Sequence, residues 1–292
     1  MALLSFLIVL PMAPFGFKVH RWVTTILLLT FIVTTIYVWS AFPFSQENPM
    51  KVFFQQRVTV DLNDATQAPV ALTTVTGAKQ YMQSRVVPQI PSSWGSTVRC
   101  TTSTVSKRLS TCVWQTGLLP SPLGSSSTID GRSAWITANA TRTSSTSAVI
   151  SVKGTNSRSC RVYFNTPINA FNVYEVLPNG TSVPSSQKMQ PAYPIPSEGL
   201  TSLWMMSRTW DRQFTAEVSW MPPADGNGPS PFAGQVGCEW SEYESATLGL
   251  GIPANLTGSI PAFEEVLTYL PKWVVATKLS EGLVEVLGSF NV

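Results

Sequence analysis

The chain has 292 residues, a length that suits one or two domains. Only 12% of the residues are charged, and the formal net charge is +3. The basic residues do not form the dense stripe that nucleic-acid-binding proteins need, so a nucleic-acid-binding function is excluded. The chain has one histidine and four cysteines, which limits the chemistry that its side chains can perform.

The first apolar run covers residues 1–17, and Pro11, Pro14 and Gly16 interrupt it. It lacks the charged n-region and the small-residue cleavage site of a secretory signal. We therefore interpret residues 1–17 as the end of a preceding membrane helix. The alternative is a hydrophobic leader on a protein with a single membrane span.

Residues 22–42 contain no charge and are long enough to cross a hydrocarbon core of about 30 Å. Pro43 ends this predicted transmembrane helix. Residues 18–21 hold a lysine, a histidine and an arginine, whereas the next basic residue on the other side is Lys51. The positive-inside rule therefore predicts a cytosolic basic turn at 18–21 and a lumenal location after residue 42. A buried core helix is the alternative to a membrane span.

The part from residue 50 to residue 292 is predicted to be one lumenal, mainly β domain. Its short runs of β-forming residues are separated by Gly/Pro turns, which favours an antiparallel β-sandwich, or two, with few short helices. A parallel α/β fold is disfavoured because long amphipathic helices do not alternate with the strands. The predicted strands cover 51–62, 110–116, 133–141, 147–154, 159–165, 169–177, 201–210, 213–221 and 235–242.

Two helices are predicted in this domain, at 77–87 and at 260–271. The second has Pro261 in its first turn and acidic residues near its N-terminus, which complement the helix dipole. Its apolar residues recur at helical spacing, so we expect one face to pack on the sandwich. A partner-binding helix is the alternative.

The four cysteines all follow the predicted membrane helix, and four cysteines allow three connectivities. We favour Cys100–Cys112, which would link two neighbouring strands, and this leaves Cys160–Cys238 to join distant strands. A zinc site is the competing interpretation. It is disfavoured because paired C-x-x-C motifs and an accompanying histidine are missing.

Three N-x-S/T sequons also lie beyond the predicted membrane helix, at Asn139, Asn179 and Asn255. A Ser/Thr-rich chain produces some sequons by chance. Sequons, cysteines and helix flanks nevertheless agree on the lumenal side, so we predict N-glycosylation at these three residues.

Catalytic chemistry is limited by the single histidine, His20, which lies in the predicted cytosolic turn. This excludes Ser–His–Asp, Cys–His and two-histidine zinc sites in the β domain. Pairs of acidic residues could cleave a glycosidic bond, but we interpret them as solvated or as helix-dipole partners. These pairs are Asp61 with Asp64, Glu239 with Glu242, and Glu264 with Glu265.

Two further patterns have a structural and a binding interpretation. Residues 225–228, "DGNG", resemble part of a calcium loop but lack the downstream acidic ligand. The tryptophans of the β domain are typical of a core, with an exposed carbohydrate-binding platform as the alternative. We therefore predict no catalytic, cofactor-binding or metal-binding residue in this chain.

Several segments resemble, in the same order, the C-terminal part of fungal vacuolar membrane proteases. They are "AFPFSQENPMKVFFQQRVTVDL", "STCVWQTGLLP", "SLWMMSRTWDRQFTAEVSW", "GQVGCEWSE" and "IPAFEEVLTYLPKWVVATKLSEGLVE". The resemblance implies a dinuclear zinc aminopeptidase-like domain, then a bundle of membrane helices, then a lumenal β domain. This chain resembles only the last helix and the lumenal domain, and the zinc ligands and catalytic carboxylate of the family have no counterpart in it.

The resemblance therefore implies a non-catalytic, membrane-anchored lumenal domain in the vacuolar membrane, with an accessory or structural role. Zinc is expected only in the missing catalytic domain, and the expected partners are the lipid bilayer and the remaining membrane and protease domains. The alternative is a glycan- or protein-binding β-sandwich module on a membrane anchor. Two explanations of the start at Met1 stay open. Either the chain is a truncated or split product, or Met1 is a gene-model artefact and the protease is encoded upstream.

Overall fold

The computed structural model describes residues 21–62, 67–103, 106–120, 135–176, 194–221, 231–240, 247–248, 258–278 and 282–292. The chain divides into two units, Met1–Ser45 and Gln46–Val292. The expectations for residues 1–17 and for His20 lie outside the described residues.

The first unit contains the helix α2, Arg21–Ser40, close to the predicted span of 22–42. None of its residues is buried, and by length and composition it could cross a membrane. The hydroxyls of Thr25, Thr30 and Thr35 donate to backbone carbonyls one turn earlier, at 2.7–2.9 Å. These polar side chains are thus satisfied within the helix, which lowers the cost of an apolar environment.

The second unit is mainly β, and this prediction is confirmed. Its described residues form a 12-stranded sheet and a two-stranded sheet. The small sheet consists of β11 (Thr247–Leu248) and β12 (Gly258–Ser259). The large sheet contains β1 (Met50–Val60), β2 (Val70–Ala78), β3 (Arg99–Thr102), β4 (Leu109–Thr116), β5 (Ile136–Ser144), β6 (Ser147–Gly154), β7 (Ser159–Val176), β8 (Leu200–Met206), β9 (Gln213–Trp220), β10 (Ala233–Trp240), β13 (Val274–Lys278) and β14 (Val284–Asn291).

The large sheet is mixed. Its order is β3-β4-β2-β1-β14-β10-β7-β9-β6-β5, with β13 beside β1 and β8 beside β7. Most pairs are antiparallel, but β1 runs parallel to β13 and to β14. The chain leaves β1 and returns only after most of the domain has been built, so these pairings need no tight hairpin and can be parallel.

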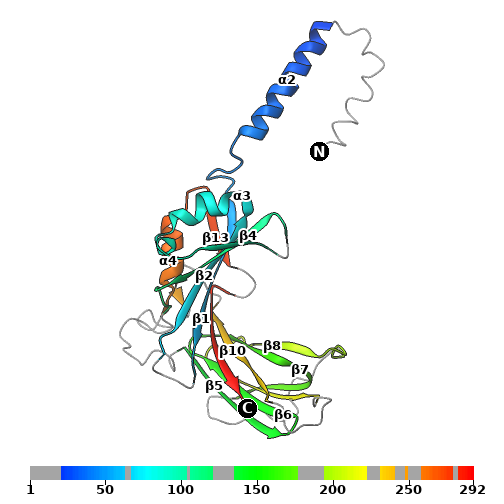
Figure 1. The fold of residues 1–292 in the computed structure, drawn as a ribbon, viewed down its shortest axis with the longest axis vertical. Coiled ribbons are helices and arrows are strands. Elements are labelled where there is room, and N and C mark those ends of the chain that lie inside the picture. The colour runs from blue at the N-terminus through cyan, green and yellow to red at the C-terminus, as the bar shows by residue number, and fades with distance from the viewer. Residues whose placement is uncertain are drawn as a thin grey trace. The chain divides into compact units, whose positions relative to one another are not determined.

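The strand β7 is one continuous element of 18 residues where the sequence predicts two strands. Residues 159–163 pair with β10 and β8, and residues 168–176 pair with β9. The strands β10 and β14 lie close to β5 and β6, which are not their hydrogen-bonding neighbours. The sheet therefore folds back on itself into two layers that share β7 (Figure 1).

An aromatic group fills the space between these layers. The rings of Trp220 and Phe232 are stacked with centroids 3.9 Å apart, and Phe164 and Phe290 lie within about 6 Å of Phe232. All four side chains are buried or nearly so. Burial of this aromatic surface contributes to the apolar stabilisation of the two-layered part.

The helices cover another part of the sheet. The helix α4, Pro261–Tyr269, packs Phe263 on Phe54 of β1, with ring centroids 5.0 Å apart. The predicted helix at 77–87 is present only from residue 79 onward, as short turns in which Met82 and Val86 are buried, while residues 77 and 78 belong to β2. These turns are α3 (Lys79–Tyr81), a π-helical turn (Met82–Val86) and 3₁₀ turns at Val87–Gln89 and Pro91–Ser93.

Candidate functional site

Two disulfides link directly opposite residues of neighbouring antiparallel strands. Cys160 of β7 pairs with Cys238 of β10, and Cys100 of β3 pairs with Cys112 of β4. This is the connectivity that the sequence favours. Cys160 and Cys238 are buried, although 78 residues separate them in the chain.

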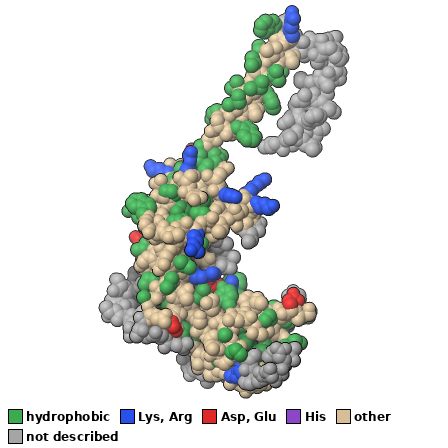
Figure 2. Space-filling model, in the orientation of Figure 1, with side chains coloured by type: hydrophobic (Ala, Val, Ile, Leu, Met, Phe, Trp, Pro, Cys, Tyr) green, Lys and Arg blue, Asp and Glu red, His purple; other side chains and the backbone are tan. Residues whose placement is uncertain are grey.

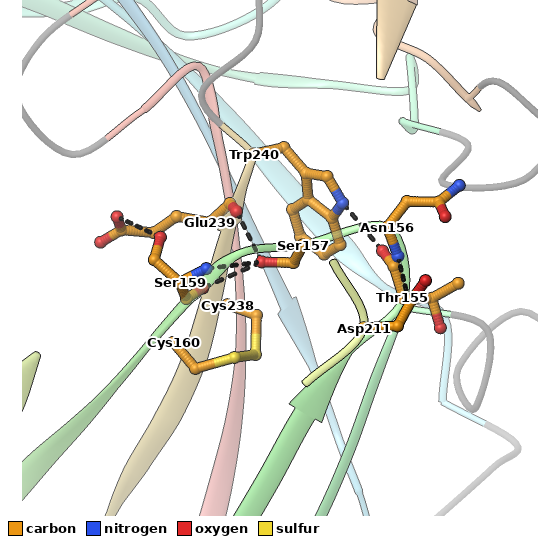
Figure 3. Close-up of a disulfide and its surroundings, with 9 residues drawn as sticks. All are labelled: Thr155, Asn156, Ser157, Ser159, Cys160, Asp211, Cys238, Glu239 and Trp240. Carbon is orange, nitrogen blue, oxygen red and sulfur yellow. Dashed lines mark hydrogen bonds between the residues drawn. A yellow bond between two sulfur atoms is a disulfide. The ribbon is translucent and has the colours of Figure 1, made fainter. Parts of the chain in front are cut away.

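The segment between β6 and β7 is held against the Cys160–Cys238 disulfide by polar contacts (Figure 3). Ser157 Oγ donates to the carbonyl of Glu239 at 2.7 Å, and Trp240 Nε1 donates to the carbonyl of Thr155 at 2.9 Å. The backbone N–H of Asn156 donates to Asp211 Oδ1 at 2.7 Å. These backbone and side-chain hydrogen bonds hold the segment over the disulfide and shield it from solvent.

A glycine permits this close packing. A Cβ atom on Gly154 would lie 2.7 Å from Cys238 Cβ and 2.8 Å from Ser157 Cβ. Both neighbours are near the backbone and cannot move away cheaply. Gly154 is therefore required where β6 passes the disulfide.

Charged side chains gather on the opposite side of the same strands, since successive residues of a strand point to opposite faces. Glu239 of β10 and Glu285 of β14 are direct cross-strand partners, and they are only 3% and 0% exposed. Two buried carboxylates at this separation repel each other unless cations or donors compensate them.

Each carboxylate has its own arginine. Arg57 Nη2 lies 2.8 Å from Glu285 Oε2, and Arg57 Nε donates to the same oxygen at 2.9 Å. Arg161 Nη2 lies 3.4 Å from Glu239 Oε1. Buried ion pairs of this kind are costly to break, because the remaining charge is left without compensation.

Tyr163 joins the two ion pairs. Its hydroxyl donates to Glu285 Oε1 and accepts from Arg161 Nη1 at 3.3 Å. Arg161 also lies under the ring of Trp204, 5.2 Å from its centroid. We call Arg57, Arg161, Tyr163, Glu239 and Glu285 the Arg–Tyr–Glu cluster.

Burial of Tyr163 and its hydrogen bond to Glu285 raise the pKa of its hydroxyl well above the ordinary value of 10.0. The hydroxyl therefore stays protonated and acts as a donor throughout the physiological range. A neutral tyrosine held in this way stabilises the buried carboxylate and is a poor general base.

Gly237 makes room for the cluster in the middle of β10. A Cβ atom at this position would lie 2.6 Å from Leu287 Cδ2 and 3.3 Å from Glu285 Oε1. Because Gly237 has no side chain, the side chains of Glu285 and Leu287 from β14 can occupy the space beside it.

Of the acidic pairs considered in the sequence, only Glu264 with Glu265 lies wholly within the described residues. Glu239 meets Glu285, while Glu242 and Asp64 lie outside the described residues. Glu265 accepts a hydrogen bond from the backbone N–H of Ser92 at 2.8 Å and so ties α4 to the 3₁₀ turn. Sequence reasoning missed Glu285, although its place in the apolar run "LVEVLG" is a signal of a buried charge.

The donor set does not fit a zinc centre. All four cysteines are in disulfides, and the single histidine lies outside the described residues. Among the residues that the structure describes, no three His, Cys, Asp or Glu side chains come together to hold a metal ion. The Arg–Tyr–Glu cluster has internally compensated charges, and its chemistry is that of a structural network.

The remaining predicted positions divide into core, surface and undescribed residues. Trp114, Trp220 and Trp240 are buried, whereas Trp94 and Trp204 are 66% and 51% exposed on separate elements. Asn139 is exposed on β5, opposite Ser151 of β6. Asn179, Asn255 and the "DGNG" segment lie outside the described residues.

The fold and the site define a class of protein: a disulfide-linked, mainly β domain that follows an apolar helix and holds a buried ion-pair network. Residues 50–286 match the family described as "Vacuolar membrane protease, C-terminal domain". The chain belongs to this family, and the resemblance inferred from the sequence segments is confirmed.

Curated relatives carry the name vacuolar membrane protease. The proteins of Laccaria bicolor, Coprinopsis cinerea and Schizophyllum commune are 34%, 36% and 37% identical to this chain, and each match covers all of it. The chain spans only 31%, 31% and 28% of these relatives.

A solved structure, the yeast delta-COP-I mu-homology domain complexed with Dsl1 WxWxV peptide, covers 84% of the chain at 9% identity. Its TM-score is 0.27, which is too low to support an argument.

Proposed function

We propose that this chain is a non-catalytic, membrane-anchored C-terminal domain of a vacuolar membrane protease, with α2 in the bilayer and residues 50–292 in the vacuolar lumen. The family match to a C-terminal domain, over about 30% of the relatives, is the observation that carries the proposal. The absence of a metal-binding donor set among the described residues supports it. The remaining membrane and protease domains of the family are the natural partners.

The chemistry of the β domain supports a lumenal location. Two disulfides form and persist outside the reducing cytosol. Asn139 is exposed on β5, the strand at one end of the sheet order, where a glycosyltransferase could reach it. Glycosylation at this edge would also block pairing with a second sheet.

The proposed accessory role is to provide a stable lumenal body that resists proteolysis. Proteases cleave segments that open locally, and opening is rare where strands are held by disulfides and buried ion pairs. The Cys160–Cys238 disulfide and the Arg–Tyr–Glu cluster together connect β1, β7, β10 and β14. These strands belong to the centre of the large sheet, so the whole domain shares this protection.

Glycosylation in yeast cells tests the lumenal placement. We expect glycosidase treatment of the full chain to increase its gel mobility. The Asn139→Gln variant should show a smaller increase, because it lacks one glycan. The glutamine keeps the polar character of this exposed position, so the substitution should leave folding unaffected. A chain that is expressed in the membrane fraction without any glycosidase-sensitive shift would contradict the proposal.

A binding module is the second candidate, because Trp204 and Met206 are 51% and 63% exposed on β8. This strand pairs with β7 and with no other strand among the described residues. Saturable binding to a glycan array that is lost on Trp204→Ala and kept on Trp94→Ala would favour this candidate. If a correctly folded chain binds no glycan on the array, the binding module is refuted and the accessory role is retained.

A further inference from the structure

Five basic side chains lie at one end of the strands that surround the start of β1. Lys51 is the second residue of β1, Lys79 follows the end of β2, and Lys107 with Arg108 precedes β4. Lys272 precedes β13. All five are exposed. We call this set the basic end.

Strand register brings these residues to the same end of the sheet. Ala78 is opposite Leu109, and the backbone N–H of Lys79 donates to the carbonyl of Arg108 at 2.9 Å. Met50 is opposite Val274, and its N–H donates to the carbonyl of Trp273 at 2.8 Å. The grouping follows from the backbone and does not depend on flexible side-chain positions.

Apolar and aromatic side chains flank the basic end. Leu267 and Tyr269, near the C-terminal end of α4, are 46% and 51% exposed, and Val275 is 47% exposed. Tyr81 and Trp273 form an edge-to-face pair with centroids 6.1 Å apart. The ring of Tyr269 is exposed and those of Tyr81 and Trp273 are partly exposed. Such rings beside lysines are typical of surfaces that lie at the headgroup level of a bilayer.

Positive charge predominates at this end. No described carboxylate is recorded in an ion pair with any of the five basic residues. Glu47 is exposed in the segment before β1, and Glu264 and Glu265 lie toward the start of α4, with Glu265 bound to Ser92. Figure 2 shows Lys and Arg side chains over the part of this unit that contains α3, β4 and β13.

The covalent chain limits how far the basic end can be from the helix. The helix α2 ends at Ser40 and β1 begins at Met50, so residues 41–49 form the whole connection. Nine residues span at most about 30 Å when fully extended. Through this short connection, the bilayer that α2 crosses is present at a high effective concentration for the second unit.

We propose that the basic end docks on lipid headgroup phosphates in the leaflet that faces the β domain, in the membrane that α2 crosses, and that anionic headgroups strengthen this contact. This inference rests on the membrane anchor of the proposed function. Lysines and Arg108 attract the phosphate groups, while Tyr269, Leu267 and Trp273 enter the interface. The domain is thereby held to the membrane by a second contact besides its helix.

Hydrogen exchange of the full chain in lipid nanodiscs tests this inference. Two disc compositions are compared: phosphatidylcholine alone, and phosphatidylcholine with about 30% phosphatidylserine as the probe. We expect amides of residues 79–86 and 267–275 to exchange at least about tenfold more slowly in the anionic discs, since each basic residue near such a surface contributes about fivefold in affinity. Amides of β5 and β6 should exchange equally in both.

A charge-reversed variant combines Lys51→Glu, Lys79→Glu, Lys107→Glu and Lys272→Glu, and should lose the extra protection while staying in the discs through α2. The control, Lys153→Glu with Arg208→Glu, reverses two exposed charges elsewhere in the unit and should keep the extra protection. A set of four Lys→Gln changes repeats the test if the reversed variant unfolds. Equal exchange in both discs would overturn the inference and leave the basic end to a protein partner. Loss of the chain from both discs would instead overturn the membrane anchor, and this inference with it.

Discussion

Glu285 is fully buried on β14, directly opposite the nearly buried Glu239 of β10. Its charge is tolerated because Arg57 and Tyr163 both reach it. The local sequence around Glu285 shows a charge within an apolar strand but does not reveal its partners. Arg57 lies 228 residues away in the chain, so only the folded sheet brings the pair together.

Replacing Arg57 by methionine should leave Glu285 buried without its cation. We expect a loss of about 3 kcal/mol in the free energy of unfolding, the lower end of the usual range because the Arg57 side chain is 43% exposed. Urea unfolding of the chain in detergent measures the change. The control, Arg208→Met on the surface, should cost less than about 0.5 kcal/mol. Equal effects of both changes would contradict the structural role of the cluster.

The raised pKa of Tyr163 predicts how the free energy of unfolding depends on pH. Its folded pKa is raised above the ordinary 10.0, so the neutral hydroxyl contributes stability below about pH 10. This contribution is lost as the pH rises above 10, because the unfolded tyrosine then ionises and the folded one does not. Tyr163→Phe should cost about 1–3 kcal/mol at pH 7. The difference from the wild type should shrink between pH 10 and pH 11, and a constant difference would refute this assignment.

At the scale of the elements, the two disulfides should differ in their effect on stability. Cys160–Cys238 closes a separation of 78 residues and Cys100–Cys112 one of 12. The chain-entropy relation gives about 4.5 and about 3 kcal/mol for the two. We expect Cys160→Ala with Cys238→Ala to lower the free energy of unfolding more than the matched change at Cys100 and Cys112. Urea unfolding of both variants measures this, and a reversed order would contradict the prediction.

Elements with a strong local signal could be predicted from the sequence. The strand β6 has the predicted bounds, β4 and β9 are within one residue of theirs, and α4 lies within the predicted 260–271. The strands β13 and β14 were missed, because their place in the sheet depends on parallel pairing with β1, more than 200 residues away. Local periodicity carries no information on such distant pairing.

The strand β7 is a second case in which local sequence does not reveal distant strand pairing. Its predicted halves are separated by "TPI", which includes the strand-breaking Pro167. In the structure the strand continues through this point, where the register of pairing with β8 shifts. The change of neighbours from β10 to β9 explains why a proline is tolerated there, since the ladder is already interrupted.

For the whole molecule, the account predicts a protein without metallopeptidase activity of its own. The purified chain, supplied with zinc, should show no aminopeptidase turnover and no stoichiometric zinc binding by elemental analysis. The physical reason is that its four cysteines are in disulfides and its sequence has a single histidine. Metal-dependent turnover that copurifies with the chain and is abolished by a chelator would contradict this.

The central claim, that the β domain lies on the lumenal side of the membrane, is tested most directly by protease protection. The full chain carries an epitope tag after Val292, and sealed vacuoles that contain it are treated with protease before and after addition of detergent. The account predicts that a tagged fragment containing α2 and the β domain survives in sealed vacuoles and is degraded only when detergent and a reductant open both membrane and disulfides. Loss of the tag in sealed vacuoles would place the domain in the cytosol and contradict the account.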